Sequence, residues 1–202
     1  MEINIKQVCY NQYYSHIERL YNDIYLKELN IIESPYKEDI YDKHSFHLIL
    51  EYDSRYIGYV RIIKPVNSLP AFEIVKPNVL VDIENSIEIS RLMIEKEYRL
   101  IPTVLIKLLR HMLILLLKEN IGSIIVDAFY NGNNKTDDLF KSIGFKQISD
   151  TYNDTRFIDR KCILLYLDLK NKQVENADNI NLKRYIIKEY NKLFSIHNIV
   201  AK

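Results

Sequence analysis

Three consecutive segments decide the fold: SIEISRLMI at residues 86–94, PTVLIKLLRHMLILLLKE at 102–119 and IGSIIVDAF at 121–129. The first and third are short β-rich runs and predict strands, whereas the longer middle segment has proline in its first turn and predicts a helix. Polar residues interrupt the leucines and isoleucines of the middle segment, so we expect a largely buried core helix and not a membrane span. The order strand, helix, strand is the centre of the predicted domain.

The neighbouring segments extend this unit into a mixed sheet. Apolar and aromatic residues at three- and four-residue steps predict a helix over 13–29, and two β-rich runs at 46–52 and 56–63 predict a hairpin. The remaining predicted elements are a loop over 31–44, a short helix over 135–142 ended by Gly144, and strands over 145–148 and 162–169. We therefore predict the α/β class in a layered α+β form, with helices flanking a mixed β-sheet.

The length of 202 residues favours one domain with an extension. We assign residues 1–170 to this domain. A polar, linker-like segment follows, and apolar residues at helical spacing then predict an amphipathic helix over 182–194, so we assign 171–202 to a linker and a C-terminal helical extension.

Charge and hydropathy exclude several classes of protein. A net charge of +1 provides no general attraction for nucleic acid or an anionic membrane surface. The first ten residues lack the basic start and apolar stretch of a secretory signal, and no apolar run approaches a membrane span, so we expect a cytoplasmic protein without integral membrane contact.

Metal and common cofactor motifs are missing from the sequence. The two cysteines are far apart, and the His44/His47 pair lies at the start of a predicted strand, so we expect no metal site. No phosphate loop, dinucleotide fingerprint or Gly-x-Ser-x-Gly motif occurs, which leaves kinase, dehydrogenase and hydrolase functions without support. We expect no permanently bound cofactor.

Two motifs resemble known acyltransferases. The stretch LFKSIGFK at 139–146 resembles the closing helix and turn of GNAT acyltransferases, although simple helix capping also explains it. The stretch EISRL at 88–92, preceded by DIYD at 39–42 and GYVR at 58–61, is similar in order and spacing to acyl-homoserine-lactone (autoinducer) synthases. The chain thus resembles a GNAT-like acyltransferase of the branch that includes N-acyl amino acid synthases. It has no tryptophan, which lactone synthases usually carry near the N-terminus.

The resemblance implies transfer of a fatty acyl group from an acyl carrier protein or acyl-CoA thioester to the amine of an amino acid or similar small molecule. Glu88 is the candidate base, although it could instead form an ion pair with Arg61 or Arg91. Ser90 lies two residues along the same strand and would help orient the site. The other charged residues of the motifs are implied to shape the substrate site and to be partly structural: Asp39, Asp42, Arg61 and Arg91.

The segment from Arg99 to Val104 corresponds to the pyrophosphate loop of coenzyme A-dependent relatives. Pro102 replaces a small residue there and offers no N–H donor, which favours an acyl carrier protein as the donor. The candidate donor-binding residues are Arg99, Thr103, Lys107 and Arg110. Three alternatives remain: a solvated helix face that binds nothing, an ordinary coenzyme A-dependent acetyltransferase, and an inactive GNAT-like binding module that uses the C-terminal helix.

Overall fold

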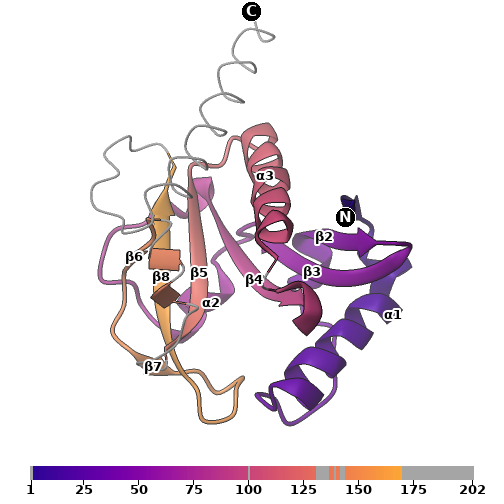
Figure 1. The fold of residues 1–202 in the computed structure, drawn as a ribbon. Coiled ribbons are helices and arrows are strands. Elements are labelled where there is room, and N and C mark those ends of the chain that lie inside the picture. Colours follow the sequence, from indigo (N-terminus) through magenta and orange to yellow (C-terminus); the bar gives the residue numbers. More distant parts are fainter. Residues whose placement is uncertain (1, 100, 131–136, 139, 142–143, 170–202) are drawn as a thin grey trace, which may run out of the picture.

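A mixed sheet of eight strands forms the centre of the domain in the computed structural model (Figure 1). The structure describes residues 2–99, 101–130, 137–138, 140–141 and 144–169. The strand order is β1-β2-β3-β4-β5-β8-β6, and β7 also pairs with β8. The strands are β1 (Ile3–Val8), β2 (Ser45–Tyr52), β3 (Arg55–Ile63), β4 (Ser86–Ile94), β5 (Ser123–Tyr130), β6 (Lys146–Gln147), β7 (Tyr152–Asn153) and β8 (Lys161–Asp168). The predicted mixed sheet is confirmed.

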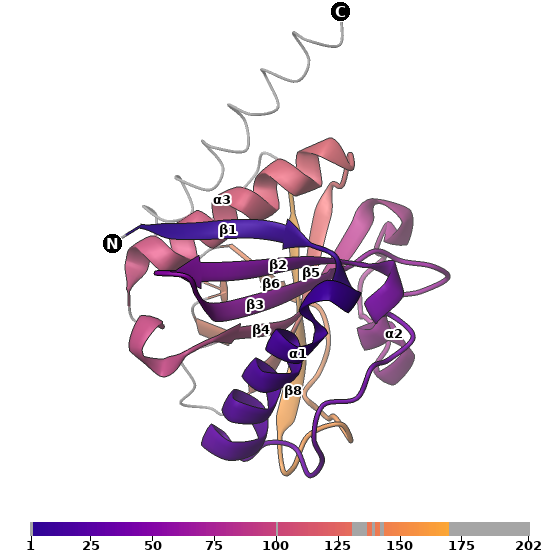
Figure 2. The same cartoon turned by 90° about the vertical axis from the view of Figure 1, so that its right-hand side faces the viewer.

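Helices cover both faces of the sheet (Figures 1 and 2). Helix α3 (Pro102–Lys118) packs on one face, where its apolar side chains share a core with Ile87 and Ile89 of β4. Helices α1 (Tyr10–Tyr21) and α2 (Pro70–Ile74) lie on the opposite face, in two separate apolar clusters. The long apolar segment is therefore a core helix, as predicted, and no helix of the described residues is long and apolar enough to cross a membrane.

Most of the predicted elements are present, with differences at their ends. The hairpin of β2 and β3 forms, and the first helix begins at Tyr10 and continues from α1 as a π-helix over Asn22–Glu28. Short 3-10 turns occupy Asp42–His44, Ile83–Asn85 and Lys96–Tyr98. The prediction missed β1, α2 and β7. Strand β1 buries only Ile3 and Ile5, and α2 and β7 are too short to show a periodic pattern.

The turn at Gly144 agrees with the predicted end of a helix. Gly144 has a φ of 114°, in the left-handed region that glycine favours, and the buried Phe145 donates its N–H to the carbonyl of Phe140. The short helix predicted over 135–142 lies partly outside the described residues. The predicted extension 171–202 lies entirely outside them.

Strands β4 and β5 are the parallel pair of the sheet, and they separate halfway along. Pairing runs from Ser86 opposite Ser123 to Ile89 opposite Val126, whereas β4 continues to Ile94 and β5 to Tyr130. Figure 1 shows the two strands diverging. A register shift against β3 adds a bulge, at which Arg91 has a φ of 50°. Beyond Ile89 and Val126, β4 pairs with β3 and β5 pairs with β8, but the two strands no longer pair with each other. This separation of the strands is the opening between β4 and β5.

Gly58 marks a close approach between β3 and β4. A Cβ atom at this position would lie 2.8 Å from the backbone carbonyl oxygen of Met93, and backbone cannot move aside cheaply. We expect Gly58→Ala to lower the free energy of unfolding by about 1–3 kcal/mol. Urea denaturation measures this, with Lys76→Ala on the exposed surface as the control. Equal stability of the two variants would contradict the prediction.

Candidate active site

Glu88 lies in the paired half of β4, just before the strands separate. Its side chain is on the face covered by α2, and the residue is 1% exposed. Oε2 accepts a hydrogen bond of 2.9 Å from the backbone N–H of Ala71 at the start of α2. Within the described residues it forms no ion pair with Arg61 or Arg91, so the alternative role considered for this carboxylate does not occur in this structure.

The environment of Glu88 suits a proton acceptor. Burial raises the pKa of Glu88 to about 7, against the lowering effect of the Ala71 hydrogen bond, and the nearby negative charge of Asp127 adds to the rise. A carboxylate with a pKa near neutrality can both take up and release a proton at physiological pH. A buried carboxylate with a raised pKa is rarer than a surface glutamate, so Glu88 is a candidate for a functional residue.

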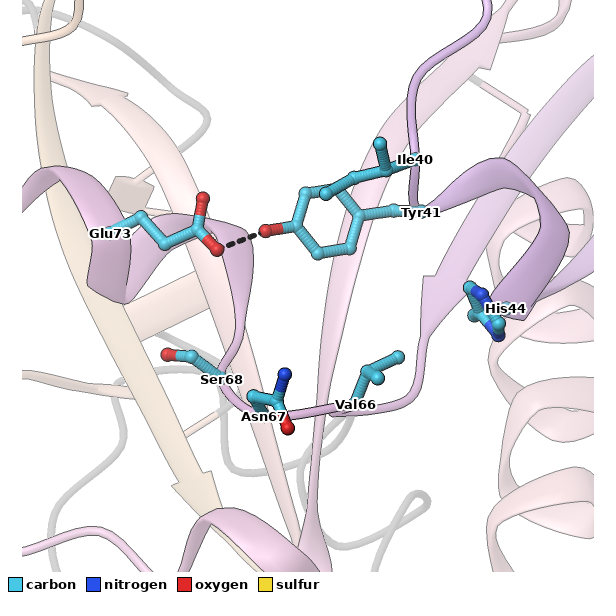
Figure 3. A pocket seen from close by; sticks show the side chains of 7 residues that line it. All are labelled: Ile40, Tyr41, His44, Val66, Asn67, Ser68 and Glu73. Atoms are coloured by element: carbon cyan, nitrogen blue, oxygen red, sulfur yellow. Dashed lines mark hydrogen bonds between the residues drawn. The ribbon is translucent and has the colours of Figure 1, made fainter.

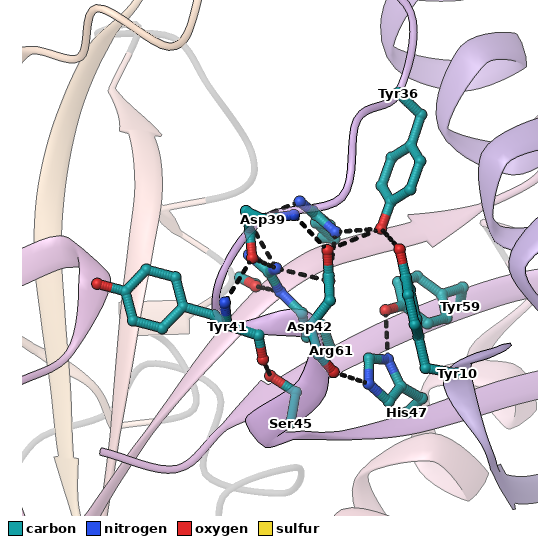
Figure 4. Close-up of polar contacts among 11 residues, drawn as sticks. Tyr10, Tyr36, Asp39, Tyr41, Asp42, Ser45, His47, Tyr59 and Arg61 are labelled. Atoms are coloured by element: carbon teal, nitrogen blue, oxygen red, sulfur yellow. Dashed lines mark hydrogen bonds and ion pairs between the residues drawn. The ribbon is translucent and has the colours of Figure 1, made fainter. Parts of the chain in front are cut away.

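The four charged residues predicted for the substrate site do meet in space, and Figure 4 labels Asp39, Asp42 and Arg61 among them. Nη1 of Arg61 lies 2.7 Å from Asp39 and 2.8 Å from Asp42, and Arg91 lies 2.7 Å from each of the same two carboxylates. Nε of Arg61 also donates to Oγ of Ser90 at 2.8 Å. Two arginines and two aspartates thus form one neutral network that ties the 31–44 loop to β3 and β4.

This network is largely buried and is supported by tyrosine and histidine side chains. Asp42 is 1% exposed, and its carboxylate accepts the Tyr36 hydroxyl as well as both guanidinium groups. Burial alone would raise the pKa of Asp42, but Arg91 and Arg61 outweigh it and hold that pKa below its usual value. The ring nitrogens of His47 contact the hydroxyl of Tyr59 and the backbone carbonyl of Asp42. The loop is therefore held rigidly above the sheet.

A small pocket opens beside the same loop (Figure 3). It has a volume of about 160 Å³ and is lined by Ile40, Tyr41, His44, Val66, Asn67, Ser68 and Glu73. The hydroxyl of Tyr41 contacts the carboxylate of Glu73. Burial raises the pKa of Tyr41, and the negative charges of Glu73 and Glu88 contribute to the rise, which places this side of the pocket near Glu88.

A second charged cluster was not predicted from the sequence. Asp127 of β5 and Asp154 both contact the guanidinium of Arg156, and Cys162 of β8 is adjacent. Burial raises the pKa of Asp127 to about 6. The available signal was an acidic residue inside the apolar run IIVDAF, since a charge in a buried strand is seldom accidental.

The predicted donor-binding residues lie just before α3 and along it. The guanidinium of Arg99 binds both carboxylate oxygens of Glu28, at 2.6 and 2.8 Å, and the carbonyl of Ile94. Lys107 donates to the carbonyl of Ile3 at 3.0 Å, so it fixes β1 against α3. Thr103 and Arg110 are exposed on α3. Leu100, within the predicted loop, lies outside the described residues.

Comparisons with known proteins agree with this architecture. Residues 20–108 match the family model described as Acetyltransferase (GNAT) domain. No curated protein sequence matches the chain. A CoA-dependent acyl-homoserine lactone synthase, MesI, has a TM-score of 0.61 and 15% sequence identity over 95% of each chain.

Two further solved structures illustrate the range of similar proteins. FeeM, an N-acyl amino acid synthase from uncultured soil microbes, has a TM-score of 0.59 and 14% identity over 83% of this chain and 91% of its own. The protein yncA from Salmonella typhimurium, solved with acetyl-CoA, has a TM-score of 0.58 and 14% identity over 85% and 96%. At these identities the likeness shows a shared fold.

Proposed function

Since this chain has the GNAT fold, which supports transferase activity, we propose that it is an N-acyltransferase acting on small amines. It moves a fatty acyl group from an acyl carrier protein or acyl-CoA thioester to the amine of an amino acid or similar molecule. The observation that carries the proposal is Glu88, a buried carboxylate with a pKa of about 7 beside the opening between β4 and β5.

Amide formation from a thioester requires a proton acceptor and donors for the oxyanion, and two features of β4 support the proposal. Glu88, directly or through one water, takes a proton from the amine as nitrogen attacks the thioester carbonyl. The bulge at Arg91 interrupts the ladder of β4 next to the opening, where backbone N–H groups can stabilise the oxyanion. As the C–N bond forms and the C–S bond breaks, the departing thiolate takes up a proton.

The network of Asp39, Asp42, Arg61 and Arg91 serves mainly to position the site. Each arginine is already paired with both aspartates, so no guanidinium is held in reserve for a substrate. Asp39 is the more exposed acid, with 37% of its side chain accessible, and it is the member able to meet an acceptor. Ser90 accepts from Arg61 and thereby links this network to the strand of Glu88.

The donor would approach at the first turn of α3. This helix begins shortly after β4 ends at Ile94. At that end of β4 the strand has already separated from β5. Helix N-termini favour anions such as phosphate, and exposed Thr103 lies in this turn. Pro102 removes one N–H from the anion site, which suits the single phosphate of a carrier-bound pantetheine. Arg110, exposed further along α3, would face an acidic carrier protein.

The test is a reaction of the purified protein with a panel of amino acids and either acyl-CoA or acyl carrier protein thioesters. We expect N-acyl amino acids detectable by mass spectrometry. If the carrier protein is the donor, a large excess of free coenzyme A should leave the rate nearly unchanged, whereas a coenzyme A-dependent enzyme should be inhibited. Absence of any amine-dependent product with both donor classes would contradict the proposed function.

A further inference from the structure

The pocket beside the 31–44 loop has apolar and acidic walls (Figure 3). Ile40 and Val66 supply exposed apolar side chains, and Tyr41 supplies an aromatic ring. The carboxylate of Glu73 enters from α2 and accepts a hydrogen bond from the hydroxyl of Tyr41. Apolar walls beside a carboxylate fit a long side chain that has an apolar stem and a cationic end.

The pocket is large enough for the end of such a side chain. Its volume is about 160 Å³. A cavity of about 150 Å³ can hold a benzene-sized group. A guanidinium or ammonium group with its last methylene groups is of similar size and would fill the pocket.

Glu73 has no cationic partner among the described residues. Its carboxylate bonds to the neutral hydroxyl of Tyr41, and its other oxygen has no protein donor in this part of the chain. The neighbouring cations are engaged elsewhere, since Lys64 contacts Glu119 and Arg61 is paired with two aspartates. Glu73 can therefore pair with a cation that a ligand brings, without giving up an ion pair of its own.

The electrostatic potential at this side of the pocket is negative. Burial raises the pKa of Tyr41, and the hydrogen bond to Glu73 raises that pKa further. The charged groups of the described residues that act most strongly on Tyr41 are all carboxylates: Glu73, Glu88 and Asp39. This excess of negative charge favours a cationic group over a neutral or an anionic one.

Helix α2 connects the pocket with the proposed base. The backbone N–H of Ala71 binds Glu88, and Glu73 lies two residues further along the same helix. Glu88 itself does not line the pocket. A group held at Glu73 is therefore anchored near Glu88 and differs from the amine that reacts.

A metal ion fits this pocket less well than an organic cation. Among the described residues that line it, Glu73 and His44 are the side chains of the types that bind metals. A metal site takes more protein ligands than these two side chains provide. The apolar walls would also contribute nothing to a metal ion.

Resting on the proposed acyl transfer, we propose that this pocket binds a second, cationic group of the acceptor through Glu73, while the α-amine of the acceptor reacts. The acceptors are then basic amino acids, whose side chains end in a guanidinium or ammonium group. The methylene groups of such a side chain contact Ile40 and Val66, and the cationic end donates to the free oxygen of Glu73.

Arginine and citrulline are matched probes of the pocket, because they differ chiefly in the charge at the end of the side chain. Calorimetric titration of the wild type should give an affinity about 5- to 10-fold higher for arginine than for citrulline. This range lies between an exposed ion pair and a protected hydrogen bond to a charged group. In the acyl-transfer assay, kcat/KM should have the same preference.

Glu73→Gln should abolish the preference for arginine, because the amide keeps an oxygen for Tyr41 but carries no charge. Glu84→Gln is the matched control, since Glu84 is exposed outside the pocket and should leave the preference unchanged. A salt series on the wild type does not depend on variant folding. Added salt should weaken the binding of arginine more than that of citrulline.

The titration separates this inference from the proposed function. Selective binding of arginine that depends on Glu73, in a protein without amine-dependent thiol release, would contradict acyl transfer and support the cation site. Equal affinities for arginine and citrulline, or a preference that persists in Glu73→Gln, would overturn the assignment of the pocket whether or not the protein transfers acyl groups.

Discussion

Glu88→Gln is expected to lower kcat for acyl transfer about 100-fold or more, because general-base catalysis contributes roughly 10²- to 10⁴-fold. Glutamine retains the shape of the side chain and an oxygen that can accept from Ala71, but it cannot take up a proton. The measurement is the rate of thiol release in the presence and absence of the amine. Retention of full amine-dependent turnover would show that Glu88 is not the base.

The pH dependence of kcat/KM is a second test of the role of Glu88. Glu88 must be ionised to accept a proton, and burial raises its pKa to about 7. The wild-type kcat/KM should therefore rise with pH and level off above about 7. The residual activity of Glu88→Gln should lack this rise.

The stability of Glu88→Gln should move in the opposite direction from its activity. The folded protein holds the Glu88 proton up to about pH 7, whereas the unfolded chain releases it near 4.5, so the folded state binds more protons between these values. Stability contributed by this group therefore falls as pH rises through that window, by on the order of 3 kcal/mol. We expect Glu88→Gln to gain stability relative to the wild type between pH 5 and 8. If Glu88→Gln fails to fold, Glu88 is a structural residue.

Asp42→Ala is expected to destabilise the protein strongly. Asp42 is 1% exposed and accepts from Arg61, Arg91 and Tyr36, so its removal leaves two guanidinium groups short of a partner. Breaking a buried ion pair on one side costs about 3–5 kcal/mol. For a protein of this size the melting temperature should fall by roughly 6–20 °C.

Circular dichroism during heating measures this change. The matched control is Asp23→Asn, which removes an acid from an exposed helical pair with Lys27 and should have an effect within about 0.5 kcal/mol. If the melting temperature of Asp42→Ala falls as little as that of Asp23→Asn, the network is dispensable for folding. Asp42 would then be a candidate for direct substrate contact alone.

The central elements could be predicted because their signals are local. The hairpin follows from two β-rich runs around a turn, and α3 follows from a long apolar segment that begins at proline. For the same reason, the sequence could place four motif residues on neighbouring strands: Glu88, Ser90, Arg61 and Arg91. Elements with little periodicity were missed, namely β1, α2 and β7.

The sequence by itself determined the strands β2 to β5 and β8, the core helix and the motif residues of the candidate site, since side-chain periodicity and turn chemistry act over a few neighbouring residues. Only the tertiary structure decided the partners. Glu88 meets the N–H of Ala71 instead of an arginine because the short helix α2 packs over β4, 17 residues away in sequence. Asp127 lies near it because β4 and β5 are parallel neighbours across the intervening helix. Such contacts depend on long-range packing, which no local pattern encodes.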